Sequence, residues 1–117
     1  MQRILVVEDD LDTAQTFAIM LREMGHQVVF AINGRAALEV ASNFRPDTVF
    51  VDMLLPDMDG SDLARQLRAL AKPEELFVVA VTGVDGDEVQ RRAMLGGCNA
   101  FLRKPVDRTV VDRLLAA

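Results

Sequence analysis

Short apolar runs alternate with stretches of helical periodicity along the chain, which is the pattern of repeated strand–helix units. The apolar runs are rich in β-branched residues and lie at residues 4–7, 27–31, 48–51, 77–81 and 100–103. Apolar residues recur at helical spacing over residues 14–21, 37–44, 63–71, 87–95 and 106–115. The fourth helical stretch has the weakest apolar face, because Val89, Ala93 and Met94 stand among charged residues.

The predicted strands are apolar throughout rather than alternating, which favours a parallel sheet buried on both faces. Because crossovers between parallel strands are right-handed, few topologies remain. We therefore predict an α/β fold, namely a flavodoxin-like, doubly wound sheet of five parallel strands in the order 2-1-3-4-5, with helices on both faces. One such domain accounts for residues 1–117.

Polar side chains directly follow four of the apolar runs. Glu8 and Asp9 follow the first run, Asp52 the third, Thr82 the fourth and Lys104 the fifth. The carboxyl ends of parallel strands meet at one edge of a sheet, where doubly wound folds place their sites. The first and third strands are neighbours in the predicted order, so Glu8 and Asp9 are expected to face Asp52.

This set of side chains suits a divalent cation and a phosphoryl group. Three adjacent carboxylates repel one another, and a hard cation such as Mg²⁺ relieves that conflict. A carboxylate can also attack phosphorus. Asp52 is the predicted nucleophile, because its strand lies between the acid pair and the strands that carry Thr82 and Lys104. The hydroxyl and the ammonium would each meet a phosphoryl oxygen.

Charge and composition exclude several other classes of protein. The formal net charge of −5 argues against direct binding of nucleic acid, which needs a basic face. No apolar stretch approaches the roughly 18 residues of a membrane span, and acids follow the first apolar run too soon for a signal peptide. The single Cys98 excludes an internal disulfide. We therefore expect a cytoplasmic protein without membrane insertion.

Four motifs, in their order and spacing, identify a family. They are Val6–Asp10, Asp52 with Pro56 and Gly60 after it, Val81–Gly83, and Phe101–Pro105. Together they resemble the receiver domains of two-component response regulators, the CheY-like family, over essentially the whole chain. Residues 31–38 and 104–107 resemble receivers at the C-terminus of hybrid histidine kinases, while Met1 fits a stand-alone or N-terminal receiver equally well.

The resemblance implies a regulatory phosphoacceptor rather than an independent enzyme. Asp52 would accept a phosphoryl group from a phosphohistidine on a histidine kinase or histidine phosphotransfer protein. Mg²⁺ would be held by Glu8, Asp9, Asp52 and the main-chain carbonyl of Leu54. Lys104 would precede a cis peptide bond. Thr82 and Phe101 would form the switch that shifts the face of the fourth and fifth helices, and slow dephosphorylation would reset it.

Some positions depart from the commonest family pattern. Phe101 stands where Tyr is common, and Gly83 where Ala often follows the Thr. The apolar Leu54 and Val84 flank the expected path of a hydrolytic water, which predicts a long-lived phosphorylated state.

Two other functions stay open at this point. One is a pseudo-receiver that binds partners without phosphotransfer. The other is an independent enzyme on the same fold, such as a phosphatase or a flavin protein. A haloacid-dehalogenase-type phosphatase would want an acid at Leu54, and the aromatics of a flavin site are scarce.

Overall fold

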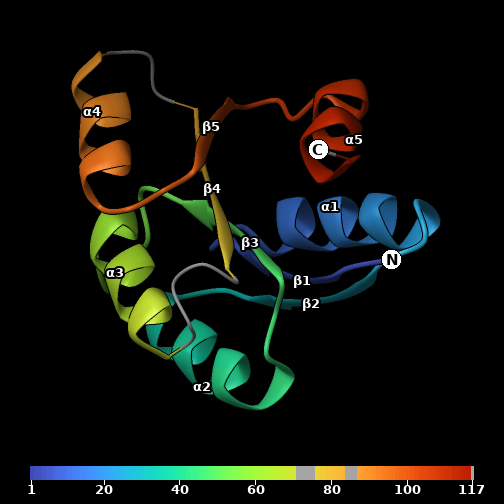
Figure 1. Ribbon diagram of the computed structural model, residues 1–117, viewed down its shortest axis with the longest axis horizontal. Helices are drawn as coiled ribbons and strands as arrows, with labels where there is room; N and C mark the ends of the chain where they lie inside the picture. The colour runs from blue at the N-terminus through green and yellow to red at the C-terminus, as the bar shows by residue number, and fades with distance from the viewer. Residues whose placement is uncertain (71–75, 84–86, 117) are drawn as a thin grey trace.

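The computed structural model describes residues 1–70, 76–83 and 87–116, and it has the α/β architecture that the sequence predicts (Figure 1). Strands and helices alternate along the chain. They are β1 (Arg3–Val7), α1 (Leu11–Glu23), β2 (Gln27–Ala31), α2 (Gly34–Phe44), β3 (Thr48–Asp52), α3 (Gly60–Leu70), β4 (Phe77–Thr82), α4 (Asp87–Leu95), β5 (Ala100–Arg103) and α5 (Arg108–Ala116).

The five strands form one parallel sheet in the order β2-β1-β3-β4-β5, which confirms the predicted topology. The register brings Val7 beside Val51 and Asp52 beside Val81, so the carboxyl ends of β1, β3 and β4 lie together. Thr82 pairs with Arg103 at the end of β5. The residues that follow these strands therefore converge at one edge of the sheet.

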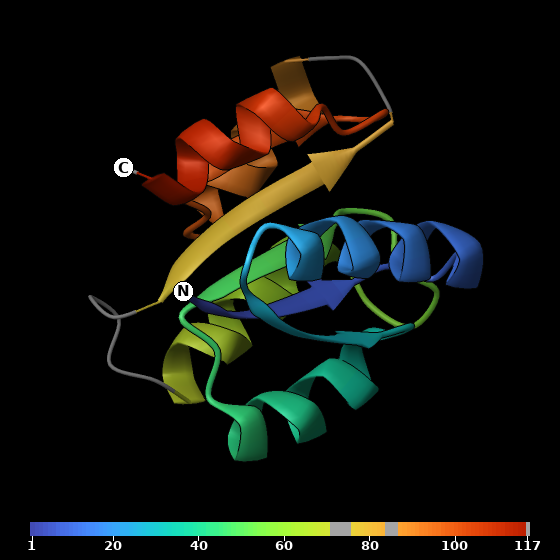
Figure 2. The same cartoon turned by 90° about the vertical axis from the view of Figure 1, so that its right-hand side faces the viewer.

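Each face of the sheet is covered by its own helices (Figure 2). Helices α2, α3 and α4 pack on one face, where Ala37, Leu63, Leu67 and Ala93 join the buried core. Helices α1 and α5 pack on the other, through residues that include Ala18, Leu21 and Val111. The strands are buried on both sides as a result, which explains why their sequences are apolar throughout.

Side-chain caps fix where the helices nearest the site begin. The Asp10 carboxylate accepts a hydrogen bond from the Thr13 backbone N–H, so α1 starts directly after the acid pair. Asn33 caps α2 in the same way through the Ala36 N–H. In both places a polar residue after the strand therefore caps the helix that follows it.

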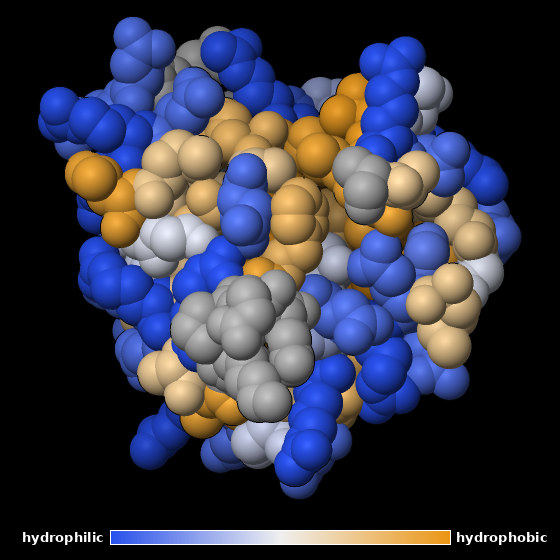
Figure 3. Space-filling view, in the orientation of Figure 1, coloured by the Kyte–Doolittle hydropathy of each residue, from blue (hydrophilic) through white to orange (hydrophobic). Residues whose placement is uncertain are grey.

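Some expected apolar positions are not buried. Leu70, Met94 and Val110 are 55%, 48% and 39% exposed, because each lies away from the sheet on its helix. Val106 precedes α5 rather than belonging to it. Ala71 and the side chain of Val89 lie outside the described residues. Hydrophobic residues also reach the surface across the upper half of the face in Figure 3, within a rim of hydrophilic ones.

Among the described residues, no helix combines the length and the apolar character needed to span a bilayer.

Candidate functional site

Three carboxylates meet where β1 and β3 end. Glu8, Asp9 and Asp52 each place one oxygen within 4.8 Å of the others. The chain buries Glu8 and Asp52, while Asp9 is exposed at the mouth of the cluster. The structure thus brings the acid pair and Asp52 together as the strand order predicts.

Lys104 joins these carboxylates from the far end of the sequence. Its Nζ forms an ion pair with Glu8 Oε1 and lies 3.1 Å from Asp52 Oδ2. The backbone holds it in place, because the Lys104 N–H donates to the Thr82 carbonyl over 2.8 Å. The Lys104–Pro105 peptide bond is cis, as the resemblance implies.

The buried charges change the proton affinities of the site. Burial, reinforced by the neighbouring Asp52, raises the pKa of Glu8 to about 7, although the hydrogen bond from Lys104 acts in the opposite direction. Burial alone would lower the pKa of Lys104, but its hydrogen bonds to Glu8 and Asp52 hold it above the ordinary value. The ammonium therefore stays charged and partly offsets the carboxylates.

Thr82 and Phe101 lie in β4 and β5, the two strands that follow β3 in the sheet. Thr82 ends β4 and is fully buried. Phe101 lies in β5 next to Ala80, is half-buried, and packs against the core beneath α2, α3 and α4. Their part in a switch stays a prediction.

The loop after Asp52 folds tightly back on the strand. The Leu54 N–H donates to Asp52 Oδ1 over 2.9 Å, and Leu54 faces Asp59 in an isolated antiparallel bridge. A Cβ at Gly60 would lie 2.7 Å from the Asp52 carbonyl oxygen and from Met53 Cα, closer than such contacts occur. Glycine is needed at this position because the start of α3 touches the end of β3.

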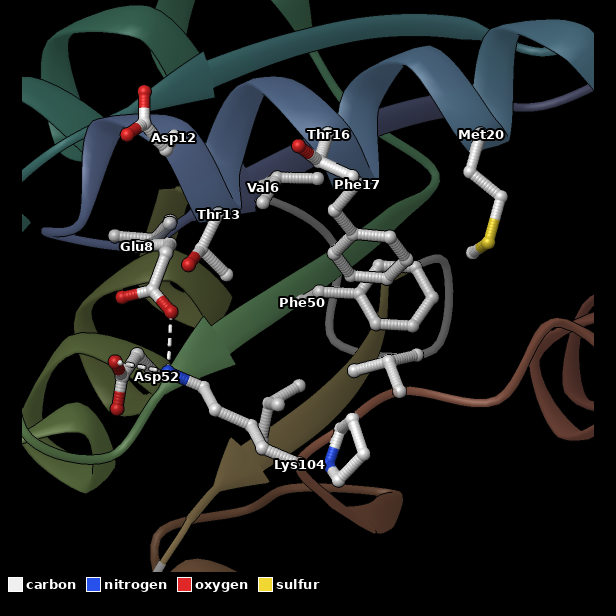
Figure 4. Close-up of a pocket in the computed structure, with 14 residues that line it drawn as sticks. Val6, Glu8, Asp12, Thr13, Thr16, Phe17, Met20, Phe50, Asp52 and Lys104 are labelled. Atoms are coloured by element: carbon white, nitrogen blue, oxygen red, sulfur yellow. Dashed lines mark hydrogen bonds and ion pairs between the residues drawn. The ribbon is translucent and has the colours of Figure 1, made fainter.

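A cavity of about 630 Å³ opens beside the carboxylates, between α1 and the loop that enters α5 (Figure 4). Glu8, Asp52 and Lys104 gather at one end of it, and Phe17 and Phe50 line its wall. The two rings meet edge to face with centroids 4.9 Å apart. The cavity gives a ligand a route to Asp52 from the side of α1.

The residues present fit a hard divalent cation. The cluster offers three carboxylates with oxygens within 4.8 Å of one another, and two of these side chains are buried. Oxygen ligands of this kind suit Mg²⁺, which also keeps some of its water. The exposed position of Asp9 leaves room for that water.

Two contacts around the site have no counterpart in the sequence analysis. Asp57 accepts hydrogen bonds from the N–H groups of Gly34 and Arg35 at the start of α2. Arg92 forms an ion pair with Asp59. No local spacing signals either contact, because each joins separate elements. Val84, expected beside the water path, lies outside the described residues.

The fold and the site together define a doubly wound α/β protein with an acid cluster and a lysine at the carboxyl edge of its sheet. The family model described as the response regulator receiver domain matches residues 4–116. The chain therefore belongs to the response regulator receiver domain family.

Known proteins of similar sequence agree. Protein PilH of Pseudomonas aeruginosa is 32% identical over 117 residues, which are 100% of this chain and 97% of PilH. An uncharacterised 14.6 kDa protein from the sodA1 3′ region of Leptolyngbya boryana is 37% identical over 112 residues, 96% of this chain and 86% of that protein.

Solved structures are also similar. The receiver domain of the sensor histidine kinase PA1611 from Pseudomonas aeruginosa, which has a magnesium ion coordinated in its active-site cleft, superposes with a TM-score of 0.87 at 30% identity over 97% of this chain and 93% of that one. A CheY-like receiver domain protein from Methanospirillum hungatei gives 0.90 at 25% identity, over 99% and 91%. As a receiver domain of two-component signalling, this chain is regulatory rather than an enzyme in the usual sense.

Proposed function

We propose that residues 1–117 form a single receiver unit in which Asp52 accepts a phosphoryl group from a phosphohistidine. The donor is a histidine kinase or histidine phosphotransfer protein in the cytoplasm. The observation that carries the proposal is the convergence of Glu8, Asp9 and Asp52 within 4.8 Å, with the Lys104 ammonium against two of them.

The transfer needs little covalent chemistry from the protein. An Asp52 carboxylate oxygen attacks phosphorus, and the bond between phosphorus and the donor imidazole nitrogen breaks, with its electron pair remaining on nitrogen. The product is an acyl phosphate on Asp52 and a free histidine on the donor. Position and charge neutralisation supply most of the catalysis in phosphoryl transfer, and both come from fixed side chains here.

Lys104 and Thr82 have separate tasks in this proposal. The Lys104 ammonium, now 3.1 Å from Asp52 Oδ2, would turn to a phosphoryl oxygen once the carboxylate is phosphorylated. The Thr82 hydroxyl hydrogen-bonds another oxygen from the end of β4. Mg²⁺, held by Glu8, Asp9, Asp52 and the Leu54 carbonyl, would neutralise negative charge on the transferring group.

The output follows from a change at one face of the molecule. Movement of Thr82 toward the phosphoryl group leaves space into which Phe101, half-buried in the neighbouring strand, repacks. This shifts the face formed by α4 and α5, which then binds a downstream domain or protein.

The experiment is intact-mass measurement after incubation with a small phosphodonor, with Mg²⁺ and with chelator. The parent chain should gain one phosphoryl group in Mg²⁺ only, and Asp52→Asn should gain none. Asp62→Asn is the matched control, since it makes the same change at an exposed acid on α3, outside the cluster. Phosphorylation of Asp52→Asn at the parent rate would contradict the proposal, as would an unmodified parent chain.

A further inference from the structure

An ion pair joins the loop after Asp52 to helix α4. The Arg92 guanidinium on α4 contacts Asp59 Oδ2, although the two residues are 33 positions apart in the sequence. The neighbouring Arg91 pairs instead with Glu88 of its own helix. Of these two neighbouring arginines, Arg92 is therefore the one that contacts the loop.

Asp59 is itself tied to the phosphorylation site. Its other oxygen, Oδ1, accepts hydrogen bonds from the Ser61 N–H at 2.8 Å and the Ser61 hydroxyl at 2.6 Å. Its backbone lies opposite Leu54. Leu54 in turn donates its N–H to Asp52. A chain of direct contacts thus runs from Arg92 through Asp59 and Leu54 to Asp52.

Close packing between α4 and α3 fixes the position of Arg92. A Cβ on Gly96 would lie 2.7 Å from Ser61 Cβ, so the end of α4 touches the first turn of α3. The Gly96 N–H donates to the Arg92 carbonyl over 3.0 Å, which places Arg92 one turn before that contact. A shift of α4 against α3 would therefore pull directly on the Arg92–Asp59 pair.

We propose that Arg92 is a positioning residue for the metal and phosphoryl site, and that it acts through Asp59 on the loop that carries Leu54. By reciprocity, occupation of the site would hold α4 in place through the same contacts. This inference rests on the proposed function, since it assumes that the loop residues serve the site. It gives α4 a connection to the site that does not pass through Thr82 or Phe101.

The positioning role predicts a local effect rather than a loss of global stability. The two side chains are 55% and 26% exposed, and exposed ion pairs contribute little to global stability. Loss of the pair should therefore leave the free energy of global unfolding nearly unchanged but loosen the loop. Coupling between such sites typically changes affinity by roughly two- to thirtyfold, and Mg²⁺ affinity should fall within that range.

The test compares five variants of the whole chain, namely four single variants and the double variant that carries both Arg92→Gln and Asp59→Asn. Arg92→Gln and Asp59→Asn remove the ion pair, while the Asn side chain keeps an oxygen for the Ser61 hydrogen bonds. Arg92→Lys restores the charge, and Arg91→Gln makes the same change one residue away. Three properties are measured: Mg²⁺ affinity by calorimetry, amide hydrogen exchange of Leu54 and Gly60 without metal, and phosphorylation by intact mass.

We expect Arg92→Gln and Asp59→Asn to speed exchange at both amides and to weaken Mg²⁺ binding, with Arg92→Lys between them and the parent. Arg91→Gln should match the parent, and the double variant should be no worse than either single one. If Arg92→Gln equals Arg91→Gln, or speeds exchange equally at all amides, the inference fails. A parent chain that takes no phosphoryl group contradicts the proposed function, while the exchange measurement still tests the contacts.

Discussion

At the scale of single residues, the backbone and the side chain of Leu54 act on the site in different ways. Its backbone N–H holds Asp52, while its side chain is 63% exposed beside the site. An apolar group there can neither accept nor donate a hydrogen bond to a water approaching phosphorus. Leu54 therefore supports Asp52, the proposed phosphoacceptor, through its backbone, while its side chain offers no help to hydrolysis.

We predict that Leu54→Asn shortens the lifetime of the phosphorylated state severalfold, because an amide can orient the attacking water. The measurement is the decay of the phosphorylated mass after removal of the phosphodonor. Leu70→Asn is the control, since Leu70 is similarly exposed, at 55%, but lies at the end of α3. Equal decay of both variants and the parent would show that this side chain does not control water access.

His26 gives a second prediction at this scale. Its Nδ1 accepts a hydrogen bond from the Gln2 N–H at 3.0 Å, which requires the neutral ring. Burial and the N-terminal ammonium lower the pKa of His26, while Asp112 on α5 acts in the opposite direction. The folded state thus binds this proton less readily than the unfolded chain. The resulting stabilisation is complete above the unfolded pKa near 6.5 and is lost as pH falls through the lower folded pKa.

His26→Asn should remove this dependence, because the amide oxygen can accept the same bond without titrating. Urea unfolding at pH 7.5 and pH 5 checks the prediction. The parent should lose more free energy of unfolding between these values than the variant does. A parallel loss in both proteins would assign the pH dependence to other groups.

At the scale of elements, the loop between β3 and α3 is held on three sides. Asp57 binds the start of α2, Asp59 binds Arg92 on α4, and Gly60 touches the end of β3. Two side-chain anchors on a loop of seven residues, 53–59, together with the close contact of Gly60 directly after it, leave the loop little freedom. The geometry of the acid cluster is therefore supported from both neighbouring helices.

Gly60→Ala should disturb this arrangement, because the added methyl group would meet backbone atoms at 2.7 Å. We expect a destabilisation of about 1–3 kcal/mol, typical of overpacking, and weaker Mg²⁺ binding. Gly83→Ala is the matched control, since the nearest atom to its Cβ would be the Lys104 side chain at 3.9 Å. Denaturant unfolding and metal titration of the two variants should differ clearly. Similar results for both variants would mean that the loop accommodates the added methyl group at position 60 without loss of stability or of Mg²⁺ binding.

The sequence predicted the elements and their order better than their contacts. Apolar runs and helical spacing report burial against the sheet, so the topology and the meeting of Glu8, Asp9, Asp52 and Lys104 could be read from the chain. The Arg92–Asp59 pair could not, because polar contacts between helices leave no periodic signal. Leu70 was misjudged for a related reason, since hydrophobicity alone does not fix which side of a helix end faces the core.

At the scale of the whole molecule, metal binding should be visible as stability. A ligand that binds only the folded state at a hundred times its Kd stabilises it by about 2.7 kcal/mol. We predict that Mg²⁺ raises the unfolding midpoint of the parent chain and that Asp9→Ala abolishes most of this rise. Without metal, Asp9→Ala should be at least as stable as the parent, because it removes one of three crowded carboxylates.

Asp12→Ala serves as the control for this prediction. Asp12 lies in the first turn of α1, outside the acid cluster, so its removal should leave the Mg²⁺-dependent rise intact. The measurement is thermal or urea unfolding at several Mg²⁺ concentrations. An undiminished rise in Asp9→Ala would exclude that residue as a metal ligand.

The ion pair between Lys104 and Glu8 spans 96 positions of the sequence, and that between Lys104 and Asp52 spans 52. Contacts between positions so far apart in the sequence carry the entropy cost of closing long loops. A ribosome must therefore release residue 104 before this site can exist. A chain that ends before residue 104 has all three acids of the cluster but lacks the ammonium that pairs with Glu8 and Asp52. Under the proposed function, a chain can therefore accept a phosphoryl group efficiently only after it has been synthesised and folded through β5.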